Sequence, residues 1–350
     1  MAAPTALRGL LEGWLTRVWW RPAPGLAAWL LWPLSWPYRG LAWTHRALAA
    51  PAAPVPVPVF VVGNLVVGGA GKTPVVMALV QALKAAGHRP GVISRGHGRR
   101  VDAVQAVTTA ADPREVGDEP ALIHRRTGVP VFVGQRRALA ATALCTAHAE
   151  VDVIVSDDGL QHHALARKAE LIVFDDRGAG NGLLLPAGPL RQPLPHALPP
   201  RTWALYTGRA TSTALPGPVV PRTVGRALPL AAWHAGTRVG ERPLAALRGR
   251  RLTALAGIGA PEQYFALLEA EGLTIDRLVC RDHADYVQTP WPAGTNEVVT
   301  TEKDAIKLAR LPAFTTPVWV LPLDCELPAV LVQNLLALLP AAQPPEKATP

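Results

Sequence analysis

Apolar and polar residues form blocks along the chain that predict strands and helices in turn. The β-branched run VPVPVFVV at 55–62 predicts a buried strand over residues 59–62, because its prolines end at position 58. Glycines follow at 63, 68, 69 and 71, and apolar residues at helical spacing then predict a helix over residues 74–85. Strand, glycine-rich loop and helix in this order are the setting that a phosphate-binding loop requires.

The alternation continues toward the C-terminus. Apolar runs predict strands at 151–156, 171–174, 203–206, 252–257 and 297–301, and helices at 261–271 and 303–308. Alternating strands and helices are typical of parallel sheets. We therefore expect an α/β fold with a P-loop NTPase-like parallel sheet core, a second smaller α/β domain and an N-terminal hydrophobic membrane-associating helical segment.

These patterns divide the chain into five predicted segments. In order, they are a Trp/Arg-rich membrane-associating segment (1–50), the phosphate-loop core (51–205), a linker rich in Pro, Gly, Arg and Thr (206–250), the second α/β domain (251–338) and a disordered tail (339–350).

The N-terminal segment is apolar and rich in tryptophan. Seven of the eleven tryptophans lie within the first 43 residues, and Glu12 is the only acid among them. Tryptophan favours the headgroup region of a bilayer, and arginine favours anionic lipid. Prolines at 22, 24, 33 and 37 interrupt the apolar run, which leaves less than the ~20 residues of a spanning helix. We expect the segment to lie in or on a membrane; an apolar helix pair packed on the protein's own core is the alternative.

Composition and charge narrow the class of protein. Hydrophobic residues make up 49% and charged residues 17% of the 350 residues, which excludes a disordered chain. The formal net charge of +9 favours anionic partners such as phosphates or acidic lipid headgroups. Basic residues are scattered and no nucleic-acid module is present, so we expect no nucleic-acid partner. The three cysteines are far apart in the sequence and match no paired metal or redox spacing, which fits a reducing compartment.

The loop after the first strand carries the clearest chemistry. Backbone N–H groups must surround a phosphate without Cβ atoms in the way, and Gly68, Gly69 and Gly71 supply this. The predicted nucleotide-binding residues are Gly68, Gly69, Ala70, Gly71, Lys72 and Thr73. Lys72 would bind the β and γ phosphates and Thr73 would ligate Mg²⁺. Val66 occupies the position where the full pattern has its first glycine, so the entry to the loop must turn differently. The loop alone does not distinguish a kinase from a GTPase or an ATPase.

A second centre of charge follows the strand at 151–156. Asp157 and Asp158 stand at its C-terminal end, where ligands gather in parallel sheets and where phosphate-loop enzymes place a further Mg²⁺ anchor. Which of the two contacts the metal stays open. Gln161, His162 and His163 come next, and we interpret the histidines as substrate or structural groups ahead of metal ligands, since Mg²⁺ prefers oxygen.

Seven short motifs occur in one order from the phosphate loop to residue 304. They are VGNLVVGGAGKTPVV, SRGHGR (94–99), GDEP (117–120), SDDGLQHH (156–163), LLPAGPLR (184–191), DHADY (282–286) and TTEKD (300–304). Together they resemble the tetraacyldisaccharide 4′-kinase family of lipid A biosynthesis, over nearly the whole chain. That family also lacks a glycine at the position of Val66. His97 departs from its usual pattern, in which a tyrosine is common.

The resemblance implies an activity and a set of residues. It implies transfer of the ATP γ-phosphate to the 4′-hydroxyl of tetraacyldisaccharide 1-phosphate, at the cytoplasmic face of the bacterial inner membrane, with Mg²⁺. The partners are then a membrane-embedded glycolipid substrate and the inner-membrane surface, with no obligate protein partner. For orientation or deprotonation of the acceptor hydroxyl it points to Asp118, assisted by His283. The weaker candidates for substrate contacts are Arg95, Gln161 and Arg191.

Other interpretations stay open at this point. Asp118 could be a helix cap, and His283 a loop histidine packed on Tyr286. A phosphate-loop GTPase or metallochaperone-type NTPase switch is the alternative function, although the guanine-reading signature N-K-x-D is absent and TEKD at 301–304 is only a partial echo. A basic membrane-bound scaffold without activity would leave the strand-end carboxylates and Gly71-Lys72-Thr73 unexplained.

Overall fold

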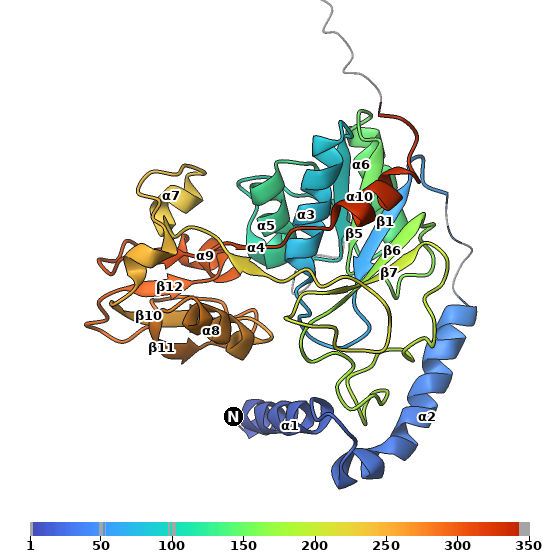
Figure 1. The fold of residues 1–350 in the computed structure, drawn as a ribbon, viewed down its shortest axis with the longest axis horizontal. Coiled ribbons are helices and arrows are strands. Elements are labelled where there is room, and N and C mark those ends of the chain that lie inside the picture. Colours follow the sequence, from blue (N-terminus) through green and yellow to red (C-terminus); the bar gives the residue numbers. More distant parts are fainter. Residues whose placement is uncertain (1–2, 49–51, 53, 97–98, 100–102, 343–350) are drawn as a thin grey trace, which may run out of the picture. The chain divides into compact units, whose positions relative to one another are not determined.

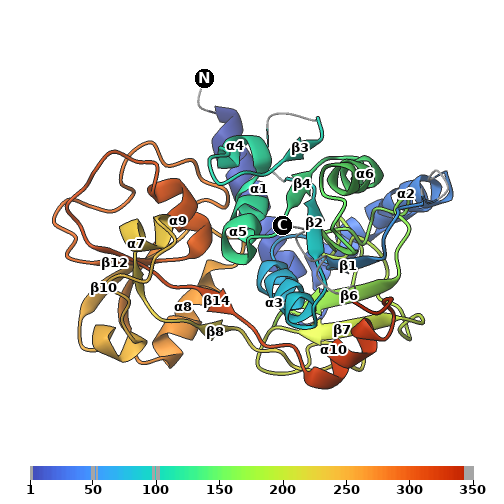
Figure 2. The same cartoon turned by 90° about the horizontal axis from the view of Figure 1, so that it is seen from above.

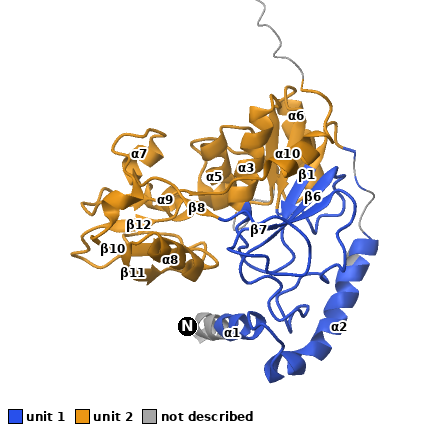
Figure 3. Cartoon of the chain, viewed as in Figure 1, with its two compact units in different colours: residues 1–54, 60–72, 158–221 blue, residues 55–59, 73–157, 222–350 orange. Residues whose placement is uncertain are grey.

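The chain forms two compact units, which Figure 3 shows in separate colours. Unit 1 comprises residues 1–54, 60–72 and 158–221, and unit 2 comprises residues 55–59, 73–157 and 222–350. The structure is a computed structural model, and it describes residues 3–48, 52, 54–96, 99 and 103–342.

Helices and strands alternate along most of the described chain (Figure 1). In chain order they are α1 (Ala3–Trp19), α2 (Leu26–Ala47), β1 (Val59–Gly63), α3 (Lys72–Ala85), β2 (Pro90–Ser94), β3 (Gln105–Ala106), α4 (Pro113–Val116), α5 (Asp118–Thr127), β4 (Val131–Val133), α6 (Arg137–Ala147), β5 (Val153–Asp157), β6 (Ala169–Phe174), β7 (Thr202–Tyr206), β8 (Thr223–Val224), β9 (Leu228–Pro229), α7 (Leu230–His234), the 3₁₀ helix η1 (Leu244–Leu247), β10 (Arg251–Ala256), α8 (Pro261–Ala270), β11 (Thr274–Val279), β12 (Val298–Thr300), α9 (Glu302–Leu308), β13 (Val318–Val320), β14 (Leu323–Asp324) and α10 (Ala329–Leu336).

The larger sheet has seven strands in the order β3-β4-β2-β5-β1-β6-β7. β2 pairs in parallel with β4 and β5, and β6 pairs in parallel with β1 and β7, whereas the short β3 runs antiparallel to β4. Every residue of β1, β2 and β5 is buried, as expected for parallel strands covered on both faces. α6 packs against β2 and β4 (Figure 2). This sheet places the carboxyl ends of β1 and β5, with the residues that follow them, at one edge.

The smaller sheet has five strands in the order β11-β10-β12-β13-β9. Its pairings are parallel except that of β9 with β13. α8 packs on β10 and β11, and its Tyr264 and Phe265 join Leu252, Val299 and Trp319 in one buried cluster. Residues 206–250, predicted as a linker, contain β8, β9, α7 and η1, and β8 pairs with β14 as a separate two-stranded ribbon.

The strands and helices predicted from hydrophobic patterning are confirmed. β1, β5, β6, β7, β10 and β12 lie where the apolar runs predict strands, and α3, α8 and α9 lie where helical spacing predicts helices. The structure therefore has the mixed α/β architecture with a parallel core that the sequence predicts.

The interruption of the N-terminal segment is only partly as predicted. Pro22 and Pro24 lie between α1 and α2, but α2 continues through Pro33 and Pro37. A proline inside a helix removes one backbone donor, and α2 continues in spite of this loss at both positions. Side-chain contacts hold this stretch: Trp32 makes edge-on ring contacts with both Trp29 and Trp36. Within the described part of the chain, no helix is both long and apolar enough to cross a membrane.

Candidate active site

The glycine-rich loop runs from the end of β1 to the start of α3. Gly68 and Gly71 have φ values of 85° and 71°, in the left-handed region that glycine adopts without strain. A Cβ atom added to Gly68 or Gly69 would meet no atom within 4 Å, so this part of the loop borders open space. Such a loop can admit a phosphate group close to its backbone.

The contacts of Val66 and its neighbours hold the entry to the loop, where the full pattern has its first glycine. Val66 forms an isolated antiparallel bridge with Leu190, and both side chains are 1% exposed. The N–H of Val67 donates to the Pro189 carbonyl at 2.9 Å, and the N–H of Arg191 donates to the Leu65 carbonyl at 2.8 Å. The entry is therefore held by a short strand-like contact with the LLPAGPLR motif rather than by glycine flexibility.

Lys72 is buried at the start of α3, and its ammonium group has two partners within unit 1. Nζ lies 3.2 Å from Asn64 Oδ1 and 3.2 Å from Asp158 Oδ1. Asn64 also donates from Nδ2 to the Gly68 carbonyl at 3.1 Å, which ties the lysine to the loop that it serves. The sequence analysis did not predict Asn64; its position directly after a buried strand and Gly63 was the available signal.

Arg191 contacts both Gln161 and the Asp158 carboxylate. Arg191 Nη1 lies 3.1 Å from Gln161 Oε1 and 3.5 Å from Asp158 Oδ1, and Gln161 donates from Nε2 to the Asn64 carbonyl at 3.1 Å. Asp158 has a φ of 48°, in the left-handed region, so the backbone leaves its extended course directly after β5. The structure thus brings together Lys72, Asp158, Gln161 and Arg191, four of the residues that the sequence predicted.

Asp157 has a different environment from its neighbour. It is fully buried at the end of β5 and accepts a hydrogen bond from Ser94 Oγ at 3.0 Å. Thr73, in the first turn of α3, is also buried. The two adjacent aspartates therefore have different partners: Asp158 pairs with Lys72 and Arg191, whereas Asp157 accepts a hydrogen bond from a hydroxyl group.

Asp118 and His283 lie together within unit 2, although they are far apart in the sequence. His283 Nδ1 is 3.2 Å from Asp118 Oδ2, and Lys307 Nζ is also 3.2 Å from that oxygen. Burial alone would raise the pKa of Asp118, but the hydrogen bond from His283 and the positive charges of Lys307 and His283 lower its pKa below the usual value. The hydrogen bond to Asp118 in turn raises the pKa of His283 against the opposing effect of burial.

The DHADY and TTEKD motifs are joined by a buried carboxylate. Asp304 is fully buried and accepts hydrogen bonds from Tyr286 Oη at 2.8 Å, from the Gly257 N–H at 3.0 Å and from Thr301 Oγ1 at 2.7 Å. Tyr286 follows His283 by three residues, so this contact holds the loop that presents the histidine. His283 itself has a φ of 55°, a conformation that such support maintains. Lys303 of the same motif pairs with Glu119, next to Asp118.

The other predicted residues are placed less tightly. Arg95 is exposed just after β2, next to the Ser94 that holds Asp157. His97 lies outside the described residues. His162 accepts a hydrogen bond from the Arg167 guanidinium at its backbone carbonyl, at 2.5 Å, within the turn after Asp158.

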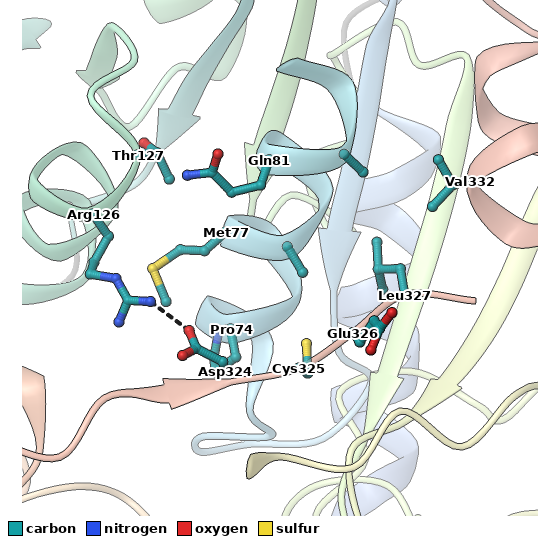
Figure 4. Close-up of a pocket in the computed structure, with 12 residues that line it drawn as sticks. Pro74, Met77, Gln81, Arg126, Thr127, Asp324, Cys325, Glu326, Leu327 and Val332 are labelled. Atoms are coloured by element: carbon teal, nitrogen blue, oxygen red, sulfur yellow. Dashed lines mark hydrogen bonds and ion pairs between the residues drawn. The ribbon is translucent and has the colours of Figure 1, made fainter. Parts of the chain in front are cut away.

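A separate cavity of about 320 Å³ lies beside α3 in unit 2 (Figure 4). Met77 and Gln81 project into it from α3, and an ion pair between Arg126 and Asp324 crosses its edge. Its lining includes neither the loop glycines nor Lys72 or Thr73. This cavity is therefore distinct from the predicted phosphate loop.

Comparison with known proteins identifies the family to which this set of residues belongs. Residues 27–340 match the family model described as tetraacyldisaccharide-1-P 4′-kinase. The tetraacyldisaccharide 4′-kinase of Methylibium petroleiphilum is 48% identical over 326 residues, covering 91% of this chain and 90% of the relative. That of Dechloromonas aromatica is 45% identical over 340 residues, covering 95% of this chain and 99% of the relative. The chain belongs to the tetraacyldisaccharide-1-P 4′-kinase family.

A solved structure agrees with this assignment. The structure of the "apo" form of LpxK from Aquifex aeolicus in complex with ATP has a TM-score of 0.71 and 26% identity, covering 89% of this chain and 99% of that chain. Membership in the tetraacyldisaccharide-1-P 4′-kinase family makes the protein a kinase and favours it over the GTPase-type switch.

Proposed function

We propose that the protein transfers the γ-phosphate of ATP to the 4′-hydroxyl of tetraacyldisaccharide 1-phosphate, at the cytoplasmic face of the inner membrane. The observation that carries this proposal is the family match over residues 27–340, together with a Gly71-Lys72-Thr73 loop in the required strand–loop–helix setting. The chemistry needs a bound triphosphate, neutralised phosphate oxygens and an oriented hydroxyl group.

The loop and Lys72 would bind the triphosphate. Gly68 and Gly69 leave room beside the backbone, and the Lys72 ammonium is already positioned by Asn64 and Asp158. An anionic phosphate would compete with Asp158 for the same ammonium group, because both are oxygen anions that pair with it. Asp158 therefore orients the lysine until a nucleotide binds.

The residues present fit Mg²⁺ as the accompanying metal. Thr73 supplies a hydroxyl and Asp157 a carboxylate, both hard oxygen donors. No group of three or more His, Cys, Asp or Glu among the described residues could hold a metal ion alone. Such a partial set suits Mg²⁺, which usually retains water and binds substrate phosphates. When bound, the ion would neutralise negative charge on the phosphate oxygens; Asp158 is the further candidate ligand.

Asp118 would act on the acceptor hydroxyl. His283 and Lys307 keep its carboxylate ionised, so it can accept a hydrogen bond and then the proton of an alcohol. Phosphoryl transfer through a loose transition state demands positioning more than a strong base, which a carboxylate of lowered pKa satisfies. Arg95, Gln161 and Arg191 are the proposed contacts to the anionic groups of the substrates.

The N-terminal segment would bring the enzyme to its lipid substrate. Large apolar side chains project from α2 and are exposed: Leu26, Trp29, Leu30, Trp32, Leu34, Trp36, Leu41 and Trp43. An apolar, Trp-rich helix flanked by arginines lies favourably at the interface of an anionic bilayer. Flotation with vesicles of anionic lipid tests this part: co-flotation supports attachment, and recovery of all the protein in the dense fraction contradicts it.

A label-transfer assay tests the activity. The purified protein is incubated with γ-labelled ATP and tetraacyldisaccharide 1-phosphate in mixed micelles, and label should enter the glycolipid. Asp118→Ala should lower kcat by about 10²–10⁴-fold while ATP still binds, because it removes the group that orients the hydroxyl. Label confined to inorganic phosphate would contradict the proposed reaction, and near-normal turnover of the variant would remove Asp118 from its role.

A further inference from the structure

Inside unit 1, a chain of contacts joins the N-terminal segment to the phosphate loop. The guanidinium carbon of Arg177 lies 4.1 Å from the centroid of the Trp20 ring, which is the geometry of a cation–π contact. The same guanidinium donates to the carbonyl oxygen of Gly69. One side chain therefore connects the residue that follows α1 with a glycine of the nucleotide site.

Arg177 is held in this position from its other side. Asp175, which is 1% exposed just after β6, accepts at Oδ2 from Arg177 Nη2 at 2.6 Å and at Oδ1 from Nε at 3.2 Å. A bidentate pair of this kind fixes the plane of the guanidinium as well as its position. The arginine is thus oriented toward Gly69 by a buried partner and does not depend on a bound ligand.

The chain that carries Trp20 is anchored through the residue before it. Trp19 donates from Nε1 to the Pro186 carbonyl at 2.8 Å, and its own carbonyl accepts from the Asn181 N–H at 2.8 Å. Both bonds reach the loop at 180–191, which also holds Val66. The backbone next to Trp20 is therefore tied to unit 1, and the Trp20 ring packs against the arginine from there.

The direction of the Gly69 carbonyl determines how the next backbone N–H of the loop points. In a trans peptide the carbonyl of one residue and the N–H of the next point in opposite directions within one plane. A hydrogen bond from Arg177 to the Gly69 carbonyl therefore sets the direction of the Ala70 N–H. Thr207 Oγ1 donates to the Ala70 carbonyl at 3.3 Å and fixes the next peptide in the same way. N–H direction is the property by which such a loop binds phosphate.

We propose that Arg177 is a positioning residue of the phosphate loop and that Trp20 acts through it. The N-terminal segment then contributes to the affinity of the loop for the nucleotide. The inference rests on the proposed function only for the identity of the ligand, ATP. It assigns to a tryptophan of the apolar segment a role in nucleotide affinity that is separate from contact with lipid.

Equilibrium binding of a fluorescent ATP analogue to the full chain in detergent, without lipid, tests the proposal. Trp20→Ala and Arg177→Lys should each raise the dissociation constant about three- to tenfold, which corresponds to the loss of an ordinary hydrogen bond or of a partly exposed cation–π contact. Trp20→Phe should restore most of the affinity, because it keeps an aromatic face. The control is the exposed Arg209→Ala, which should bind as the wild type does.

A double-mutant cycle separates positioning from general destabilisation. If Trp20 acts through Arg177, Trp20→Ala should have little further effect on ATP affinity in the Arg177→Lys background. Effects that simply add, or single variants with wild-type affinity, would overturn the proposal. Binding is read without turnover, so a wild-type protein that binds ATP but labels no glycolipid would count against the proposed function and not against this inference.

Discussion

Replacing Val66 with the glycine of the full phosphate-loop pattern should lower the stability of the protein. In Val66→Gly the consensus residue replaces a side chain that is 1% exposed and bridges Leu190. Burial of a valine side chain is worth about 1.5–3 kcal/mol, and glycine adds about 0.5–1 kcal/mol of backbone entropy to the unfolded chain. We therefore expect the free energy of unfolding to fall by about 2–4 kcal/mol.

The nucleotide site should respond in the same direction. Loss of the bridge frees the loop entry from residues 189–191, so the KM for ATP should rise although the sequence moves toward the full motif. Chemical denaturation and steady-state kinetics measure the two effects. Val239→Gly is the control: its side chain is 75% exposed, so only the backbone term of about 0.5–1 kcal/mol should remain. A Val66→Gly protein that is as stable as this control, with a lower KM for ATP, would refute the reasoning.

Two further variants test residues of unit 2. His283→Ala removes the hydrogen bond and charge that lower the pKa of Asp118, so the acid limb of the kcat/KM profile should move to higher pH. An unmoved limb would show that Asp118 is not the group that titrates. The same variant should change how stability depends on pH. In the wild type the Asp118–His283 pair stabilises the fold fully between the ordinary carboxyl pKa and the ordinary imidazole pKa; this contribution is lost as the pH falls through the lowered pKa of Asp118 or rises through the raised pKa of His283. Denaturant titrations of His283→Ala should show no such pH window. Tyr286→Phe removes the 2.8 Å hydrogen bond to the buried Asp304 carboxyl group, and denaturant titration should show a free energy of unfolding lower by about 1.5–3 kcal/mol. Tyr38→Phe is the control: it loses a hydrogen bond to a neutral carbonyl, so its loss should be about 0.5–1.5 kcal/mol. Equal losses would contradict the view that the carboxyl partner makes the Tyr286 bond stronger.

Local patterning predicted the elements because burial acts on neighbouring residues. The run at 59–62 could only be a covered strand, and the glycines before Lys72 could only be a loop, so β1 and α3 followed from the sequence. The motif residues that a strand end presents, Asp157 and Asp158, followed for the same reason.

Local patterning could not predict contacts between residues that are far apart in the sequence. Nothing local in the sequence indicates that Leu190 bridges Val66, that Lys307 pairs with Asp118, or that Arg177 contacts Gly69. Asp118 and His283 were named only through the family resemblance, because spacing does not reveal a pair separated by 165 positions in the sequence. The continuation of α2 through Pro33 and Pro37 is likewise not apparent from the sequence; there Ser35 donates to the Leu184 carbonyl and Tyr38 to the Arg191 carbonyl.

Equilibrium binding of ATP to Lys72→Ala tests the central claim that the triphosphate binds in the loop at 63–73. The variant should bind at least about tenfold more weakly, since about 1.4 kcal/mol per tenfold lies below the usual worth of a bond between charged groups. Lys84→Ala is the control on the same helix, where the ammonium donates to the Thr127 carbonyl instead, and it should bind ATP as the wild type does. Equal affinity of Lys72→Ala and the wild type would place the nucleotide elsewhere.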